Sequence, residues 1–170
     1  MRRFALASTL LVTAASPSFA GDWTGAYLGG QIGRLDGKLD DESLKGGIYG
    51  VHAGYNHQMG SVVLGGEIDY DFSDAKLDTG EKLDGIGRLK GKLGYDFGPW
   101  MAYATAGVAY AQVGGLNDTG TVYGLGVSYM AIPEWIISGE VLQHDFKSFG
   151  GAGLSDIDGP QLTLRASYKF

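Results

Sequence analysis

The sequence has no cysteine, only four prolines and, after its first twenty residues, no long apolar run. The missing cysteine excludes disulfides and thiol chemistry, so the folded chain needs another source of stability. The missing apolar run excludes a transmembrane helix in that part, because such a helix needs about 20 predominantly apolar residues. A basic excess is also missing, since 19 acidic residues outnumber 13 basic ones. This charge argues against binding of nucleic acid.

Nucleotide-binding loops are missing as well, because neither G-x-G-x-x-G nor G-x-x-x-x-G-K occurs. Glycine is nevertheless abundant, at 30 of 170 residues, against ~7% in average proteins. Many of these glycines fall at every second position, as do Gly85/Gly87 and Gly124/Gly126. Such spacing is typical of strands, in which alternate residues share a face.

The first twenty residues, MRRFALASTLLVTAASPSFA, have the build of a secretory signal peptide. Arg2 and Arg3 precede an apolar run, and the small-x-small site SFA precedes Gly21. We therefore predict a signal peptide over residues 1–20 and one exported domain over residues 21–170; an uncleaved N-terminal anchor is the alternative. Without the two arginines, 11 basic residues face 19 acidic ones, which gives the mature part a formal charge of −8.

Period-two alternation broken by turn residues dominates the mature part and predicts many short strands. We expect eight, at residues 23–32, 48–57, 62–72, 83–97, 100–111, 121–130, 135–144 and 161–170. Three short connections (HQMGS, FGP, AIPE) alternate with four longer polar ones at residues 34–47, 73–82, 113–120 and 146–160. Outer-membrane barrels have this layout, with short turns toward the periplasm and longer loops outside. The pattern predicts an all-β, eight-stranded antiparallel up-and-down transmembrane barrel, with a soluble sandwich or lipocalin-like barrel as the alternative.

Charge matching predicts which face of this barrel lies outside. In VVLGGEIDYDF three acids alternate with apolar residues, and three bases alternate likewise in GRLKGKLGYDF. Registers in which paired residue numbers sum to 159 and 305 oppose the following acids and bases: Glu67 and Lys92, Asp69 and Lys90, Asp71 and Arg88, Glu140 and Arg165. Exposed pairs contribute only about 0–1 kcal/mol each, whereas charges that lose water must be paired. We therefore predict that these eight residues form a charge network in the lumen; the solvated face of a soluble sheet is the alternative.

Aromatic residues support the membrane interpretation. One group lies next to the predicted short turns or the ends of the mature chain, where an aromatic girdle belongs. Its members are Trp23, Phe97, Trp100, Trp135, Tyr168 and Phe170. A second group lies toward the longer connections and is predicted to form the other girdle: Tyr49, Tyr70, Phe72, Tyr110 and Tyr123.

Metal binding and catalysis find little support. His57 falls in a predicted short turn, which leaves only His52, His144 and Glu140 as candidate ligands. We interpret them as luminal polar residues and predict no metal and no cofactor. The stretch LQHDFKS offers His144 and Ser148 as base and nucleophile, but no third group completes a triad. The sequence therefore predicts no enzyme.

Five motifs occur in order along the mature part: DWTGAYLGGQIG, GRLKGKLGYDF, YATAGVAYA, VYGLGVSYM and LTLRASYKF. With them the chain resembles the small OmpA-like outer-membrane β-barrels, in particular the alphaproteobacterial outer-membrane immunogenic or porin-family proteins. The resemblance implies location in the outer membrane of a Gram-negative bacterium. It also implies an assembly signal in the closing strand, formed by Leu162, Leu164, Ala166, Tyr168 and Phe170.

Three functions remain after this comparison. The leading one is a structural barrel that contributes to envelope integrity and surface interaction. The alternative is a narrow, porin-like diffusion pore, although four luminal ion pairs would leave little room for water. The third is a lipid A-modifying enzyme. The expected partners are the lipid bilayer and lipopolysaccharide, the outer-membrane assembly machinery at the C-terminal strand, and a host or phage protein at the acidic loops.

Overall fold

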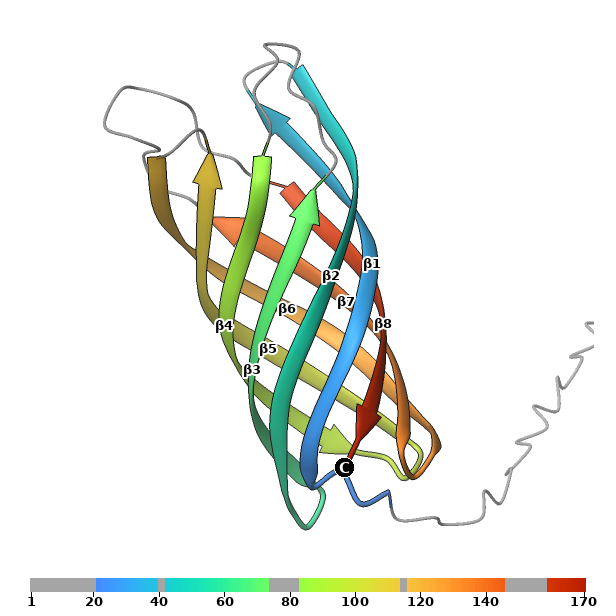
Figure 1. Cartoon of the computed structure of the whole chain (residues 1–170). Coiled ribbons are helices and arrows are strands. Elements are labelled where there is room, and N and C mark those ends of the chain that lie inside the picture. Colours follow the sequence, from blue (N-terminus) through green and yellow to red (C-terminus); the bar gives the residue numbers. More distant parts are fainter. Residues whose placement is uncertain (1–20, 40–41, 74–82, 114–115, 146–158) are drawn as a thin grey trace, which may run out of the picture.

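The computed structural model describes residues 21–39, 42–73, 83–113, 116–145 and 159–170. Eight strands form one closed barrel, in which each strand pairs antiparallel with its neighbours along the chain and β8 pairs with β1 (Figure 1). The predicted eight-stranded antiparallel barrel is therefore confirmed. The strands are β1 Gly25–Leu39, β2 Glu42–Met59, β3 Val62–Ser73, β4 Leu83–Asp96, β5 Trp100–Val113, β6 Leu116–Ile132, β7 Trp135–Asp145 and β8 Gly159–Lys169.

The two ends of the barrel differ in their connections. We call the end with the turns at residues 60–61, 97–99 and 133–134 the lower end, as it lies in Figure 1, and the opposite end the upper end. These three turns are the short connections that the sequence predicts. The C-terminus also lies at the lower end (Figure 1). Within the described residues, no helix is long and apolar enough to cross a membrane.

The prediction of four long connections at the upper end is wrong for two of them. β1 and β2 stay paired as far as Leu39 and Glu42, and β5 and β6 as far as Val113 and Leu116. Residues 34–47 and 113–120 are therefore mostly strand. A ladder uses backbone N–H and C=O groups, which charged and glycine-rich segments supply as well as apolar ones do. The other two predicted loops, 73–82 and 146–160, lie almost entirely outside the described residues.

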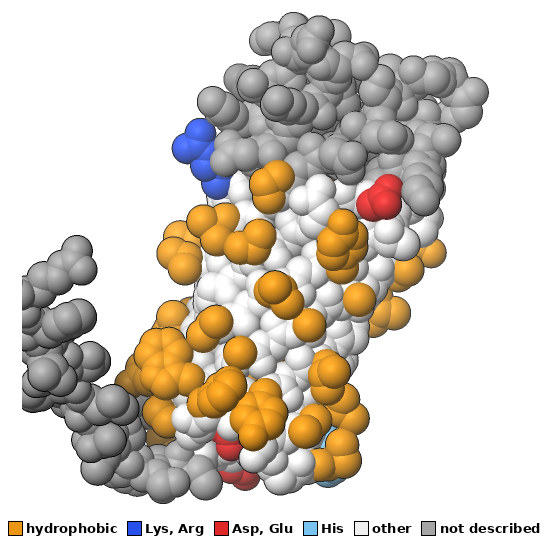
Figure 2. All heavy atoms as spheres, turned by 180° about the vertical axis from the view of Figure 1, so that it is seen from behind, with side chains coloured by type: hydrophobic (Ala, Val, Ile, Leu, Met, Phe, Trp, Pro, Cys, Tyr) orange, Lys and Arg blue, Asp and Glu red, His pale blue; other side chains and the backbone are white. Residues whose placement is uncertain are grey.

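The barrel wall is inside out relative to a soluble sheet. Large apolar side chains point outward, among them Leu125 at 68% exposure, while inward polar groups such as Glu140 are 2% exposed. Burial alternates residue by residue along β7. Figure 2 shows apolar side chains spread over one side of the wall between its two ends. An apolar outer band of this kind is what a barrel presents to lipid.

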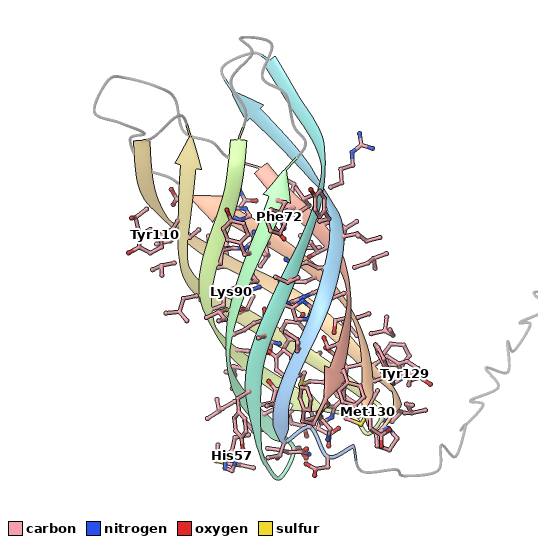
Figure 3. All side chains as sticks on the ribbon, in the orientation of Figure 1. His57, Phe72, Lys90, Tyr110, Tyr129 and Met130 are labelled. Carbon is pink, nitrogen blue, oxygen red and sulfur yellow. The ribbon has the colours of Figure 1, made fainter. Side chains whose placement is uncertain are left out.

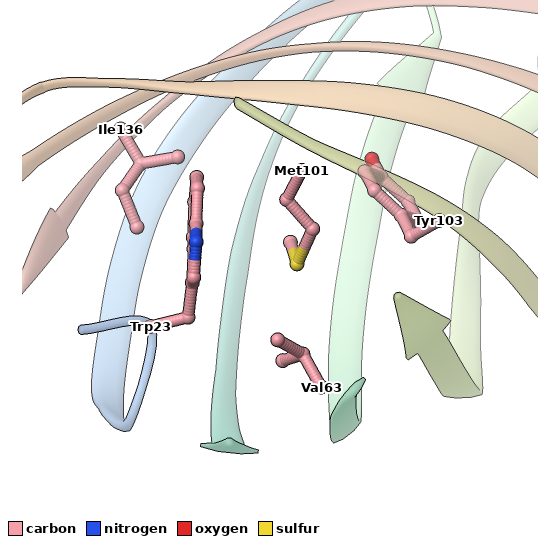
Figure 4. Close-up of a cluster of buried hydrophobic side chains, with 5 residues drawn as sticks. All are labelled: Trp23, Val63, Met101, Tyr103 and Ile136. Carbon is pink, nitrogen blue, oxygen red and sulfur yellow. The ribbon is translucent and has the colours of Figure 1, made fainter. Parts of the chain in front are cut away.

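Among the described residues, two apolar clusters lie in the interior, where alternation predicts polar side chains. The lower apolar cluster consists of Trp23, Val63, Met101, Tyr103 and Ile136 (Figure 4). The upper apolar cluster consists of Ala109, Val122 and Leu142. Between them, Lys90 lies at about mid-height in the barrel (Figure 3). The lower apolar cluster thus lies between the charged middle layer and the lower end, while the upper apolar cluster lies beside this layer, since Ala109 is opposite Arg88.

Both predicted hairpin registers are wrong by two residues. In β3 and β4 paired numbers sum to 157, so Asp69 lies opposite Arg88 and not opposite Lys90. In β7 and β8 they sum to 303, so Arg165 lies opposite Ser138 and not opposite Glu140. Long side chains also reach diagonal neighbours two residues away. Charge matching therefore identifies the two paired faces without fixing the register.

Candidate functional site: the luminal charge network

The eight predicted luminal residues are all buried inside the barrel. β3 supplies Glu67 and two aspartates, and β4 supplies three bases at alternate positions. β7 and β8 supply Glu140 and Arg165. Because side chains alternate between the two faces of a strand, the i, i+2 spacing directs each set to the lumen. The members of all four predicted acid–base pairs contact each other, as diagonal neighbours and not as directly opposite residues.

Lys90 lies at the centre of the network. Its Nζ is 3.0 Å from Glu67 Oε1, 2.9 Å from Asp69 Oδ2 and 2.8 Å from Glu140 Oε1. Arg165 joins two of the same acids, with Nη2 2.7 Å from Glu67 Oε1 and Nη1 3.0 Å from Glu140 Oε2. Since Glu67 and Glu140 are on β3 and β7, these contacts link distant parts of the wall across the lumen.

Arg88 organises the part of the network toward the upper end. Its Nε is 2.6 Å from Asp69 Oδ1, and its Nη2 pairs with Asp71. Its Nη1 donates to Gln161 Oε1 at 2.9 Å and to His144 Nε2 at 3.0 Å. Gln161 in turn donates to Asp71 Oδ2 at 2.9 Å. The guanidinium is thus shared between acids and neutral acceptors, which satisfies several of its donors in one plane.

Two tyrosines complete the part of the network toward the lower end. Tyr27 OH donates to Glu67 Oε2 at 2.8 Å, and Tyr103 OH donates to Glu140 Oε2 at 3.0 Å. Lys92 Nζ is 3.2 Å from Glu67 Oε2 and donates to Tyr27 OH at 3.0 Å. It also lies 5.0 Å and 4.7 Å from the ring centroids of Tyr27 and Tyr103, within the range of a cation–π interaction.

The sequence did not identify the uncharged residues that hydrogen-bond to the network, although the alternation pattern places them on inward faces. Alternation alone assigns Tyr27, Gln31 and Gln161 to inward faces, and Gln31 donates to Asp71 in the structure. Their residue type does not mark them as partners, because tyrosine and glutamine also occur on outer walls and rims. A rule that treats every large inward polar residue as a partner would have found them.

The three histidines do not converge. His52 Nε2 lies 2.7 Å from Ser167 Oγ, His144 contacts Arg88, and His57 is exposed on the outside near the lower end (Figure 3). Among the described residues, no group of three or more histidine, cysteine, aspartate or glutamate side chains is placed to hold a metal ion. Ser148, the candidate nucleophile, lies outside the described residues.

Five of the six predicted girdle aromatics are on the outer wall or rim at the lower end, and four ring pairs involve them, one of which is Tyr168 with Phe170 at 5.2 Å. Trp100 packs on Tyr129 with centroids 4.5 Å apart, Trp135 on Tyr168 at 5.6 Å, and Tyr95 on Phe97 at 4.9 Å. The sixth residue, Trp23, was predicted to belong to this girdle, and that prediction is wrong. Trp23 is 0% exposed and lies inside the lower mouth.

The predicted assembly signal occupies one face of the closing strand. Its five members point outward from β8 or just beyond it: Leu162, Leu164, Ala166, Tyr168 and Phe170. Phe170 N donates to Ala26 O at 2.9 Å, so this end of the chain is held against β1. The role of this face in assembly stays a prediction.

An inside-out, closed barrel with a charged lumen defines the class of outer-membrane β-barrel proteins. The chain belongs to the family described as "Outer membrane protein beta-barrel domain", whose model matches residues 4–170. It is thus a protein of the bacterial outer membrane, located in the lipid bilayer.

Curated relatives agree with this assignment. The chain is 36% identical to the 22 kDa outer membrane protein of Rhizobium leguminosarum bv. viciae over 104 residues, covering 59% of this chain and 49% of that protein. It is 28% identical to the 31 kDa outer-membrane immunogenic protein of Brucella melitensis biotype 1 over 203 residues, covering 91% and 82%. The chain thus spans about half the length of the Rhizobium relative.

Solved structures show the same fold. Neisserial surface protein A matches with a TM-score of 0.63 at 16% identity, covering 86% of this chain and 98% of that one. Ail, the attachment invasion locus protein of Yersinia pestis, matches with a TM-score of 0.62 at 15% identity, covering 86% and 97%.

Proposed function

We propose that the protein is a closed, non-enzymatic structural barrel that contributes to the integrity of the outer membrane. The observation that carries this proposal is the filled lumen. A cavity of about 10 Å³ lies among Trp23, Tyr27, Glu67, Arg165 and their neighbours. This volume is at the lower limit for a single water molecule, so this cavity does not hold a chain of water molecules.

The charges in the lumen favour bracing over conduction. Four acids and four bases balance each other, and each pairs within the network. Permeating ions need sites that they can enter and leave, whereas these side chains already engage one another. Removing one member of such a buried pair costs about 3–5 kcal/mol, so the network locks the walls at one spacing.

Planar-bilayer recording tests the closed lumen against the pore alternative. The purified full chain is reconstituted and its fold is checked by heat-modifiable migration on a detergent gel. We expect at most rare and small current steps, with a large general porin in the same bilayers as the positive control. A steady, large conductance from the folded monomer would make the pore the better assignment.

The lipid A-modifying alternative is disfavoured by where the reactive groups lie. His144, the candidate base, is buried in the lumen and contacts Arg88, so it does not face the lipid. Mass spectrometry of lipid A from cells with and without the protein tests this directly. We expect identical lipid A species, and a modification that depends on the protein would refute the non-enzymatic assignment.

We also propose surface and assembly contacts. Relatives that are named outer-membrane immunogenic proteins support exposure at the upper end, where lipopolysaccharide and a host or phage protein would meet the barrel. The outward face of β8 would meet the assembly machinery. Binding of antibodies to intact cells tests the first contact, and failure to label intact cells while labelling lysed ones would contradict it.

Residues 1–20 are proposed to be removed on export. The small-x-small site SFA directly before Gly21 supports this proposal. The mass of the protein purified from outer membranes decides the matter. We expect a chain that begins at Gly21, and a chain that still begins at Met1 would show an uncleaved anchor.

A further inference from the structure

Trp23, in the segment before β1, points into the barrel instead of lying on its rim. Trp23 packs against side chains from β3, β5 and β7, namely Val63, Met101 and Ile136. Figure 4 shows its indole, seen edge-on, between Ile136 and Met101. A tryptophan buried this fully by three separate strands occupies the space that would otherwise open toward the lower side.

Polar contacts fix the indole in place. Trp23 Nε1 donates to Asp96 Oδ1 at 3.1 Å, and Trp23 N donates to Gln58 Oε1 at 2.8 Å. Gln58 Nε2 donates to Asp96 Oδ2 at 2.8 Å, which joins the two anchors. Asp96 Oδ1 also accepts from Gly98 N at 2.7 Å. Both nitrogens of the tryptophan are thus bonded to the ends of β2 and β4.

The other side of the segment is tied to β8. Lys169 Nζ donates to Asp22 O and, at 3.5 Å, to Thr24 O. Gln58 N donates to Thr24 Oγ1 at 3.1 Å, from the opposite direction along the rim. Residues 21–24 therefore run across the mouth between β8 on one side and β2 and β4 on the other.

We propose that residues 21–24 are a built-in stopper of the lower mouth and that Trp23 is its sealing residue. The indole is itself part of the wall of the small luminal cavity, which Ser138 and Arg165 also line. Truncating the indole would connect this cavity with the lower side. The inference deepens the proposed closed barrel, on which it rests, by assigning one of its seals to residues outside the strands.

Access of a thiol reagent to the cavity tests the stopper, because the chain has no cysteine of its own. Ser138→Cys places one reporter in the cavity wall, and a charged, water-soluble methanethiosulfonate is the probe. In the folded barrel we expect slow labelling, and at least a ten-fold faster rate when Trp23→Ala is added. Trp100→Ala is the matched control, because this tryptophan lies on the outer wall at the same end.

The outcomes separate the stopper from the closed lumen. Fast labelling without any tryptophan substitution would contradict the closed lumen itself. Slow labelling that Trp23→Ala does not change, or that Trp100→Ala raises equally, would overturn the stopper alone. Heat-modifiable migration verifies folding of each variant. If Trp23→Ala does not fold, Asp96→Asn weakens the indole anchor at constant shape; we expect a smaller increase in rate, and no increase would count against the proposal.

Discussion

Replacing Glu67 by glutamine removes one charge from the network while keeping the shape of the side chain. Glu67 contacts Lys90 at 3.0 Å, Lys92 at 3.2 Å and Arg165 at 2.7 Å. After the change, four luminal bases would face three acids. Breaking a buried ion pair by removing one partner destabilises a protein by about 3–5 kcal/mol, so we expect the free energy of unfolding to fall by about this amount.

The assay is urea unfolding of the barrel in lipid vesicles, followed by tryptophan fluorescence. Glu134→Gln is the matched control, because Glu134 is exposed in a lower turn; we expect a change within ~0.5 kcal/mol. Adding Lys92→Met to the Glu67 variant removes one base and restores the charge balance. Neighbouring residues of one network commonly couple by about 0.5–3 kcal/mol, and we expect recovery of this size.

The result that refutes this reasoning is a Glu67→Gln variant no less stable than the Glu134→Gln control. Water would then compensate the three bases, and the lumen would be wetter than its small cavity indicates. A double variant that is less stable than the sum of the two single effects predicts would also contradict charge balance as the cause of the stability change.

Three further predictions concern register, close packing and assembly. Residues 68 and 89 are opposite in the structure, so oxidation should form a disulfide in the double variant Ile68→Cys with Leu89→Cys. It should form none in Ile68→Cys with Gly91→Cys, the pair that would be opposite in the register predicted from charge. Gly126→Ala should destabilise by about 1–3 kcal/mol, because its Cβ would lie 2.3 Å from the ring of Tyr103, whereas Gly66→Ala meets no atom within 4 Å and should be nearly neutral in the same urea assay. Phe170→Ala should lower the amount of heat-modifiable barrel in outer membranes, and wild-type amounts would remove Phe170 from the proposed assembly signal.

The faces of the barrel could be predicted because alternation is a local property. Leu125 and Val127 are exposed and Ser128 is buried, as their positions along β6 require. The strand number followed from the same pattern and from the turn residues. Strand length did not follow, because pairing at the upper end continues through segments whose composition resembles loops.

Register could not be predicted from charge alone. Lys90 contacts Asp69 diagonally, and Arg88 contacts the same residue from the opposite position. Both registers therefore bring the acids and bases of β3 and β4 together. The choice between them depends on the closure of the whole barrel and on the turn, which a single hairpin sequence does not determine.

The place of Trp23 could not be predicted either. A tryptophan next to a strand end fits a girdle and a mouth equally well. The difference arises at Gly25, whose φ of 143° suits glycine and where the chain changes course between the stopper and β1. Asp96, which accepts from the indole, and Gln58, which accepts from the backbone N of Trp23, are distant in the sequence and carry no recognisable signature.

The central claim is that the wall is apolar outside and the lumen is closed inside. Nitroxide labels on β6 test it directly, because this strand carries none of the eight network residues. Labels at Leu125 and Val127 should collide with oxygen and not with a water-soluble nickel chelate, while a label at Ser128 should be protected from both. Strong collision with the chelate at Ser128 would show an open pore, and strong collision at Leu125 and Val127 would show a wall that faces water.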